Sequence, residues 1–142
     1  MKSYRGPPNT VIAANTTGCH NVGVGFESLK YNTTAYYNTA YGACSLTANT
    51  TGCRNSSLGS QSMDANTEGD HNCAFGQTAL GANTTADYNS AFGSNAMADN
   101  TTGTSNAAFG AAALIGNTTG SSNTAVGRKS LQNNTTGSYI TA

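Results

Sequence analysis

The sequence is poor in the residues that build an ordinary globular core. Tryptophan is absent, only two prolines occur, and charged residues make up 8% of the 142 residues, against about a quarter in typical domains. Six basic residues balance six acidic ones and are scattered along the chain, so no basic patch marks a nucleic-acid or anionic membrane surface. No apolar run approaches the roughly 18 residues of a membrane-spanning helix. We therefore expect neither nucleic-acid binding nor membrane insertion.

The first eight residues, Met-Lys-Ser-Tyr-Arg-Gly-Pro-Pro, lack the apolar core of a secretory signal. We expect either a signal that has been removed or another route out of the cell, as for a virion component. The sequence also stops in the middle of a repeat at Ala142. That ending suggests a segment of a longer protein or one subunit of an end-to-end assembly.

What the sequence does contain is a seventeen-residue repeat without insertions or deletions. Its copies begin at Asn15, Asn32, Asn49, Asn66, Asn83, Asn100 and Asn117, with a partial eighth at Asn134. A strict short period is typical of a solenoid, and zero net charge with recurring apolar residues favours order over disorder. We predict a non-repeating cap or junction over residues 1–14 and a solenoid of seven repeats plus a partial eighth over residues 15–142.

Two corners are predicted in each repeat, whose positions are counted here from its first asparagine. Position 11 is always glycine, as a corner with positive φ or close backbone approach requires. These glycines are Gly25, Gly42, Gly59, Gly76, Gly93, Gly110 and Gly127. Asparagine at position 1, followed by threonine and usually by glycine at position 4, predicts a second corner in which the asparagine side chain bonds nearby backbone. Position 7 is also always asparagine.

Large apolar residues recur at positions 10 and 15, with small residues at positions 9 and 14. Short extended segments such as 72–75 and 78–80 separate the corners, and no apolar stripe keeps a helical period. We therefore predict an all-β fold, a β-solenoid or parallel β-roll with one coil per repeat. Coils about 4.8 Å apart make a rod of roughly 35 Å with two stacked apolar ladders.

The small apolar content of each coil predicts self-association. Burying two large apolar side chains per coil stabilises the fold by less than the conformational entropy cost of ordering its seventeen residues. We therefore expect further apolar burial between chains. The small residues at positions 9 and 14 fit close backbone approach, either between chains or inside one narrow coil.

The residues from 123 to 137 carry a resemblance to a known family. Asn-Thr-Ala-Val-Gly (123–127), Ser-Leu (130–131) and Asn-Thr-Thr-Gly (134–137) resemble the head repeats of trimeric autotransporter adhesins, and similar repeats occur in phage tail fibres. The resemblance covers residues 15–142. It implies a left-handed parallel β-roll, an intertwined homotrimer, and attachment at a cell or virion surface.

No constellation of residues predicts catalysis, a cofactor or a bound metal, so we expect the protein not to be an enzyme. His20 and His71 share position 6 but lie three coils apart, about 14 Å at the solenoid rise, and we expect both to be exposed and inert. Asp64, Glu68 and Asp70 lie near one another in the sequence, which favours a solvated loop over a calcium site.

Four cysteines raise the question of disulfides. Cys19 and Cys53 share position 5 but lie two coils apart, about 9.6 Å, beyond the roughly 7 Å limit for a bridge. Cys44 and Cys53 are the candidate pair if their corners adjoin. An interchain bridge is an open alternative. Another is that all four cysteines, Cys73 included, are free thiols packed as small residues.

The repeated Asn-Thr-Thr sequence creates candidate N-glycosylation sites. They are Asn15, Asn32, Asn49, Asn55, Asn83, Asn100, Asn117, Asn133 and Asn134. In a glycosylating extracellular system, nearly every coil would carry a sugar that shields the rod. The alternative is that Asn-Thr-Thr is the corner chemistry of the fold.

These observations predict a structural, fibre-forming rod on a cell or virion surface, an adhesin head or tail-fibre segment. Three copies of the chain would associate as a homotrimer. The variable positions 5, 6, 12 and 13 would contact a host receptor or glycan. A second hypothesis is an N-glycan-coated extracellular filament assembled end to end. A third is an ice-binding solenoid that uses the threonine column at position 2. Adjacent threonines at positions 2 and 3 would point to opposite sides of an extended strand, so only one of the two columns would face out.

Overall fold

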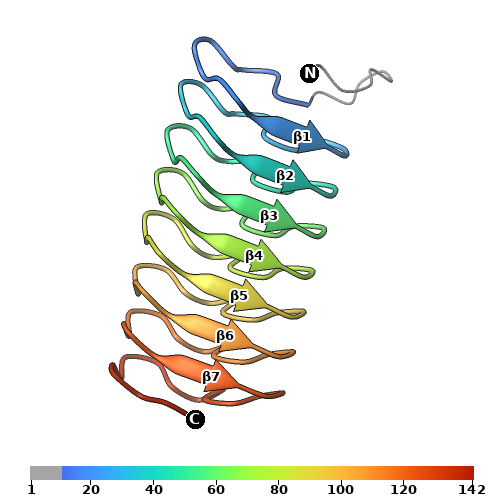
Figure 1. The fold of residues 1–142 in the computed structure, drawn as a ribbon. Helices are drawn as coiled ribbons and strands as arrows, with labels where there is room; N and C mark the ends of the chain where they lie inside the picture. Colours follow the sequence, from blue (N-terminus) through green and yellow to red (C-terminus); the bar gives the residue numbers. More distant parts are fainter. Residues whose placement is uncertain (1–10) are drawn as a thin grey trace.

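A computed structural model describes residues 11–142, which form one stack of parallel β-coils (Figure 1). Each full repeat contributes one three-residue strand. The strands are β1 (Val22–Val24), β2 (Thr39–Tyr41), β3 (Ser56–Leu58), β4 (Cys73–Phe75), β5 (Ser90–Phe92), β6 (Ala107–Phe109) and β7 (Thr124–Val126). They make a single seven-stranded parallel sheet in sequence order. The predicted all-β parallel solenoid with coils of about seventeen residues is confirmed.

Neighbouring strands pair at an offset of seventeen residues. Cys73 pairs with Ser90 and Phe75 with Phe92, and all six strand pairs keep this offset. Equivalent positions of successive repeats therefore stack along the rod. We call each such stack a column and number it by its position in the repeat, and we number the coils so that coil five contains β5.

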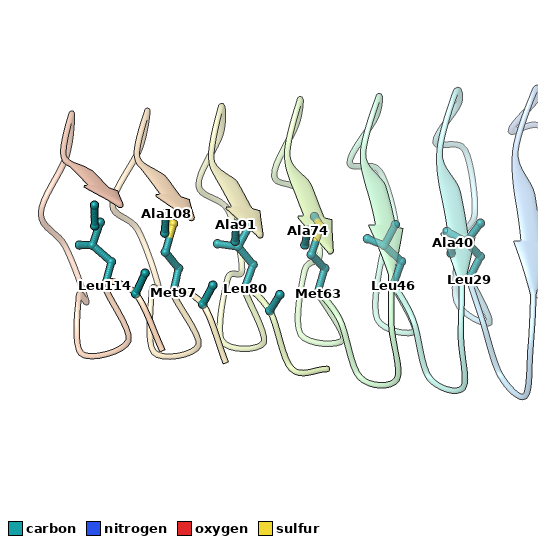
Figure 2. Close-up of a cluster of buried hydrophobic side chains, with 14 residues drawn as sticks. Leu29, Ala40, Leu46, Met63, Ala74, Leu80, Ala91, Met97, Ala108 and Leu114 are labelled. Carbon is teal, nitrogen blue, oxygen red and sulfur yellow. The ribbon is translucent and has the colours of Figure 1, made fainter. Parts of the chain in front are cut away.

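The core is a thin layer between columns 9 and 15 (Figure 2). Column 15 supplies leucine or methionine, fully buried from Leu29 to Leu114, and column 9 supplies small residues such as Ala74 and Ala91, also fully buried. The alanines face the leucines and methionines across a narrow coil (Figure 2). Small residues at position 9 thus reflect tight packing inside one coil, one of the two explanations that the sequence left open.

The second predicted apolar ladder, column 10, lies outside this core. Tyr41, Leu58 and Phe109 are 57%, 47% and 43% exposed. Successive residues of a strand point to opposite sides of the sheet, so a buried column 9 forces column 10 outward. Both predicted ladders are stacked along the rod, but only column 15 is buried within a single chain.

The segment 78–80, predicted to be extended, is a turn instead. Thr78 and Leu80 have φ of 57° and 53°, in the left-handed region that costs a non-glycine residue about 1–2 kcal/mol. Columns 6, 13 and 15 adopt positive φ throughout the rod. In column 15 the full burial of leucine or methionine offsets this cost.

The glycines of column 11 meet two demands at once. Their φ values run from 118° to 142°, a range that side chains rarely adopt. A Cβ on Gly93 would also lie 2.6 Å from the carbonyl carbon of Gly110 in the next coil. Column 11 therefore tolerates no side chain where coils stack on both sides.

Residues 11–14 continue the solenoid ahead of the first full repeat. The backbone N–H of Ile12 donates to the Ser28 carbonyl at 3.1 Å, as that of Leu29 donates to Ser45 one coil later. Ile12 also shares the positive φ of column 15, at 49°, and packs against the core. Residues 1–10 of the predicted cap lie outside the described residues.

Column 14 contains a buried hydroxyl without a partner. The Oγ atom of Ser28 is buried and makes no hydrogen bond, unlike every other buried side-chain N or O atom in the described part of the chain. Later coils have alanine in this column, at Ala79, Ala96 and Ala113, all fully buried. The hydroxyl is therefore a cost that the fold does not need.

We expect Ser28→Ala to raise the free energy of unfolding by about 1 kcal/mol, because an unpaired buried hydroxyl costs about 1–3 kcal/mol. Urea denaturation of the two proteins measures the difference. Ser62→Ala is the matched control, since the Ser62 hydroxyl donates to the Ala74 carbonyl at 3.2 Å and its loss should bring no gain. A less stable Ser28→Ala protein would contradict the assignment.

Candidate functional site

The outer face of the sheet has a column of large apolar side chains beside a column of small, mostly polar ones, and it carries no charge. We call columns 8 and 10 together the sheet face. Its large residues are Val24, Tyr41, Leu58, Phe75, Phe92, Phe109 and Val126 in column 10, beside Val22, Thr39, Ser56, Cys73, Ser90, Ala107 and Thr124 in column 8. Phe75 stacks on Phe92, and Phe92 on Phe109, each with ring centroids 5.0 Å apart and planes within 7°. This spacing is close to that of adjacent strands.

Such a face can pack against another apolar surface. Exposed contiguous apolar surface of this kind is uncommon on soluble monomers and marks interaction sites. Composition alone does not reveal this face, because a large apolar residue at position 10 would suit a core equally well. The signal that would have found it is the alternation of an invariably small position 9 with a large position 10.

The asparagines of the predicted sequons form a buried ladder. Asn32, Asn49, Asn83, Asn100 and Asn117 have no exposed surface. The Nδ2 of Asn83 donates to Oδ1 of Asn66, one coil earlier, at 2.9 Å, and to the Ala86 carbonyl at 3.0 Å.

Nδ2 is the atom to which an N-linked sugar attaches, so in these buried asparagines both its hydrogens are used inside the folded rod. Asn15 and Asn133 are exposed and Asn134 is partly buried. These three candidate sequons lie at the two ends of the described repeats.

Column 7 forms a second asparagine ladder. The Oδ1 of Asn55 accepts a hydrogen bond from the backbone N–H of Asn72 at 2.9 Å, while its Nδ2 donates to the Gly69 carbonyl at 2.7 Å. Asn55, a predicted sequon, is fully buried like most of this column. Asparagine at both corners thus adds side-chain hydrogen bonds to the backbone hydrogen bonds that join one coil to the next.

All four cysteines are free thiols in the structure, and the candidate bridge between Cys44 and Cys53 is not formed. Cys44 lies in column 13 and Cys53 in column 5, where the Cys53 thiol is buried and donates to the Thr51 carbonyl at 3.1 Å. Burial raises the pKa of the Cys73 thiol, which lowers the fraction of reactive thiolate.

Columns 5 and 6 form an aromatic and polar surface along the rod. His20 stacks on Tyr37 with centroids 4.7 Å apart, and His71 on Tyr88 at 4.9 Å. Arg54 lies over the Tyr36 ring at 5.4 Å. Both predicted histidines are exposed, and each is held against a tyrosine from the next coil.

Column 5 also supplies two carboxylates, Asp70 and Asp87. The Oδ1 of Asp70 accepts a hydrogen bond from the Cys53 backbone N–H at 2.6 Å. The Oδ1 of Asp87 accepts one from the Asp70 backbone N–H at 2.7 Å. We call the set Tyr36, Tyr37, Arg54, Asp70, His71, Asp87 and Tyr88 the rim patch.

Residues 11–142 contain no group of three or more His, Cys, Asp or Glu side chains arranged to hold a metal ion. Asp64, Glu68 and Asp70, weighed above as a calcium site, therefore do not form such a group. Partial burial raises the pKa of Asp64. The described part of the chain also has no helix of the length and apolarity needed to cross a membrane.

The threonine columns differ in how their hydroxyls are used. Column 2 hydroxyls donate to the next coil, as Thr33 Oγ1 does to the Thr50 carbonyl at 3.0 Å. Column 3 side chains such as Thr34 and Thr85 are exposed. Column 3 is therefore the more exposed of the two threonine columns, while most of column 2 is partly buried.

Comparison with known proteins gives no relative: no family model, no curated protein and no solved structure matches the chain. The assignment that stands is architectural, a parallel β-solenoid with coils of about seventeen residues.

Proposed function

We propose that the chain is a non-enzymatic structural rod whose sheet face packs against further copies of itself, in a homotrimeric fibre. The observation that supports this most is the uncharged sheet face with its stacked Phe75, Phe92 and Phe109 rings. Burying these side chains between chains removes apolar area from water, at about 25 cal/mol per Å². It also adds the apolar burial that each thin coil lacks on its own.

The period of the face favours copies of the same chain as its partner. A second rod repeats its ring positions at the same spacing, so the rings of two parallel copies stay in step along their length. A partner without this spacing would match the face at one coil and lose the match at the next. Self-association around one axis is also the commonest way in which oligomers form.

The resemblance of the repeats to adhesin heads and phage tail-fibre repeats supports a place on a cell or virion surface, with attachment as the role. Receptor contacts then fall to the variable positions 5, 6, 12 and 13. A glycan-coated filament would have to receive its sugars before folding at Asn32, Asn49 and the other buried asparagines. The hydrogen bonds of those side chains favour the bare rod.

We expect the purified chain to sediment as a trimer of about 43 kDa, three times its 14.4 kDa, and Phe92→Lys to sediment as a monomer. Phe92 is partly exposed in a single rod, so a lysine there fits the coil but would place a charge in the proposed interface. Analytical ultracentrifugation measures both masses.

Thr85→Lys is the matched control, because Thr85 is an exposed residue of the same coil outside the sheet face; it should remain trimeric. A monomeric wild-type chain would refute the self-association. Open-ended assemblies whose denatured mass carries hexose increments would instead favour the glycan-coated filament.

A further inference from the structure

The fold does not require the large side chains of the rim patch. Tyr37, Arg54, His71 and Tyr88 occupy column 6 with φ between 57° and 59°, and Ser105 and Ser122 adopt the same conformation in coils six and seven with φ of 58°. A bulky residue at positive φ is a conformational outlier. Because serine serves the same backbone, the aromatic and basic residues point to a role beyond folding.

Stacking holds these side chains in place before any ligand arrives. The His71 and Tyr88 planes lie within 10° of each other, and the Arg54 guanidinium lies over Tyr36. Tyrosine offers contact area at a low cost in conformational entropy. A surface ordered in advance loses less entropy on binding than a mobile one.

The polar ends of the rim patch are available to a ligand. Within residues 11–142, the hydroxyls of Tyr37 and Tyr88 and the guanidinium of Arg54 have no hydrogen bond or ion pair with the protein. Asp70 and Asp87 each use Oδ1 for a backbone N–H and leave Oδ2 as an acceptor. The patch thus offers both donors and acceptors and carries little net charge, with one arginine and two aspartates.

We infer that the rim patch binds an uncharged, polyhydroxylated carbohydrate chain lying along the rod. Sugar hydroxyls both donate and accept hydrogen bonds, as the mixed guanidinium, phenol and carboxylate groups demand. The two carboxylates disfavour an anionic polymer. The patch spans coils two to five, about 14 Å at the solenoid rise, which suits an extended chain. This inference rests on the proposed attachment function but uses columns separate from the sheet face.

The test is native affinity electrophoresis of the full chain in gels containing dextran, galactomannan or hydroxyethylcellulose. We expect at least one of these neutral polysaccharides to slow the wild type. Tyr37→Ser/Tyr88→Ser should weaken that binding by about tenfold or more, as loss of tyrosine anchors does at other interfaces. The serines copy those at 105 and 122, so circular dichroism should show an intact fold. Arg54→Gln supplies a second test if the double variant is unstable.

Tyr31→Ala is the matched control, since Tyr31 is a half-exposed tyrosine outside the patch in a column that has alanine in coils two to four; its binding should equal that of wild type. The inference fails if none of the three polysaccharides slows the wild type, if only polygalacturonate does, or if Tyr31→Ala weakens binding as much as the double variant. Repeating the assay on the Phe92→Lys protein separates failure of the rim patch from failure of self-association.

Discussion

Replacing Gly93 with alanine should lower the free energy of unfolding by about 4 kcal/mol, a loss large enough to identify a specific structural cause. The residue has φ of 139°, and its new Cβ would lie 2.6 Å from the Gly110 carbonyl carbon and 2.9 Å from the Ala111 nitrogen. Both contacts are backbone atoms of the next coil, which cannot move without breaking the strand register. Urea denaturation followed by circular dichroism measures the loss.

Gly127→Ala separates the two causes. Gly127 has φ of 118°, but a Cβ there would meet nothing within 4 Å. We therefore expect it to lose only the conformational part, about 1–3 kcal/mol. Equal losses for the two variants would show that close approach of the coils contributes nothing.

Asn89→Ala is expected to cost about 3 kcal/mol. The Asn89 Nδ2 donates to the Gly103 carbonyl at 2.8 Å, and its Oδ1 accepts from the backbone N–H of Asn106 at 3.0 Å. Alanine would leave the buried Asn106 backbone N–H without a partner, at about 1–3 kcal/mol. It would also remove one of the two donors to the Gly103 carbonyl, which still accepts from Asn100 Nδ2 at 2.9 Å. Chemical denaturation gives the total, and amide hydrogen exchange should show the Asn106 N–H losing protection first.

Asn133→Ala provides the comparison, because Asn133 is exposed; its effect should stay within about 0.5 kcal/mol. If Asn89→Ala were equally mild, the column 7 ladder would add nothing to the backbone hydrogen bonds between coils. Each coil contacts only its neighbours, as in other repeat proteins, so we expect the Asn89→Ala defect to remain local to coils five and six.

Much of this fold follows from the sequence because the coil repeats without insertions. An unbroken period fixes the seventeen-residue offset seen between Cys73 and Ser90, and glycine at every position 11 marks a corner that only glycine can form. Column 15 was also recognisable as large and apolar, and it is fully buried from Leu29 to Leu114. In each case one physical demand selects one kind of residue.

The structural features that the sequence did not predict are those where the residue type does not indicate the local conformation or burial. Leu80 and Thr78 adopt left-handed conformations that sequence rules assign to glycine or asparagine, because stacking against neighbouring coils overrides their preference. Column 10 looks like core by composition, but Phe92 faces out because its strand neighbour Ala91 faces in. Several asparagines of the two ladders match the N-glycosylation sequon because that rule considers only the sequence and not whether the side chain is buried.

The constant offset between strands has a consequence for how such a rod can change its length. One coil corresponds to a whole number of codons, so duplicating or deleting one repeat in the gene keeps the reading frame and every column. The cross-section would stay the same while the rod lengthens or shortens by a single step of about 4.8 Å. Reach can therefore be adjusted by recombination alone, without any new packing solution.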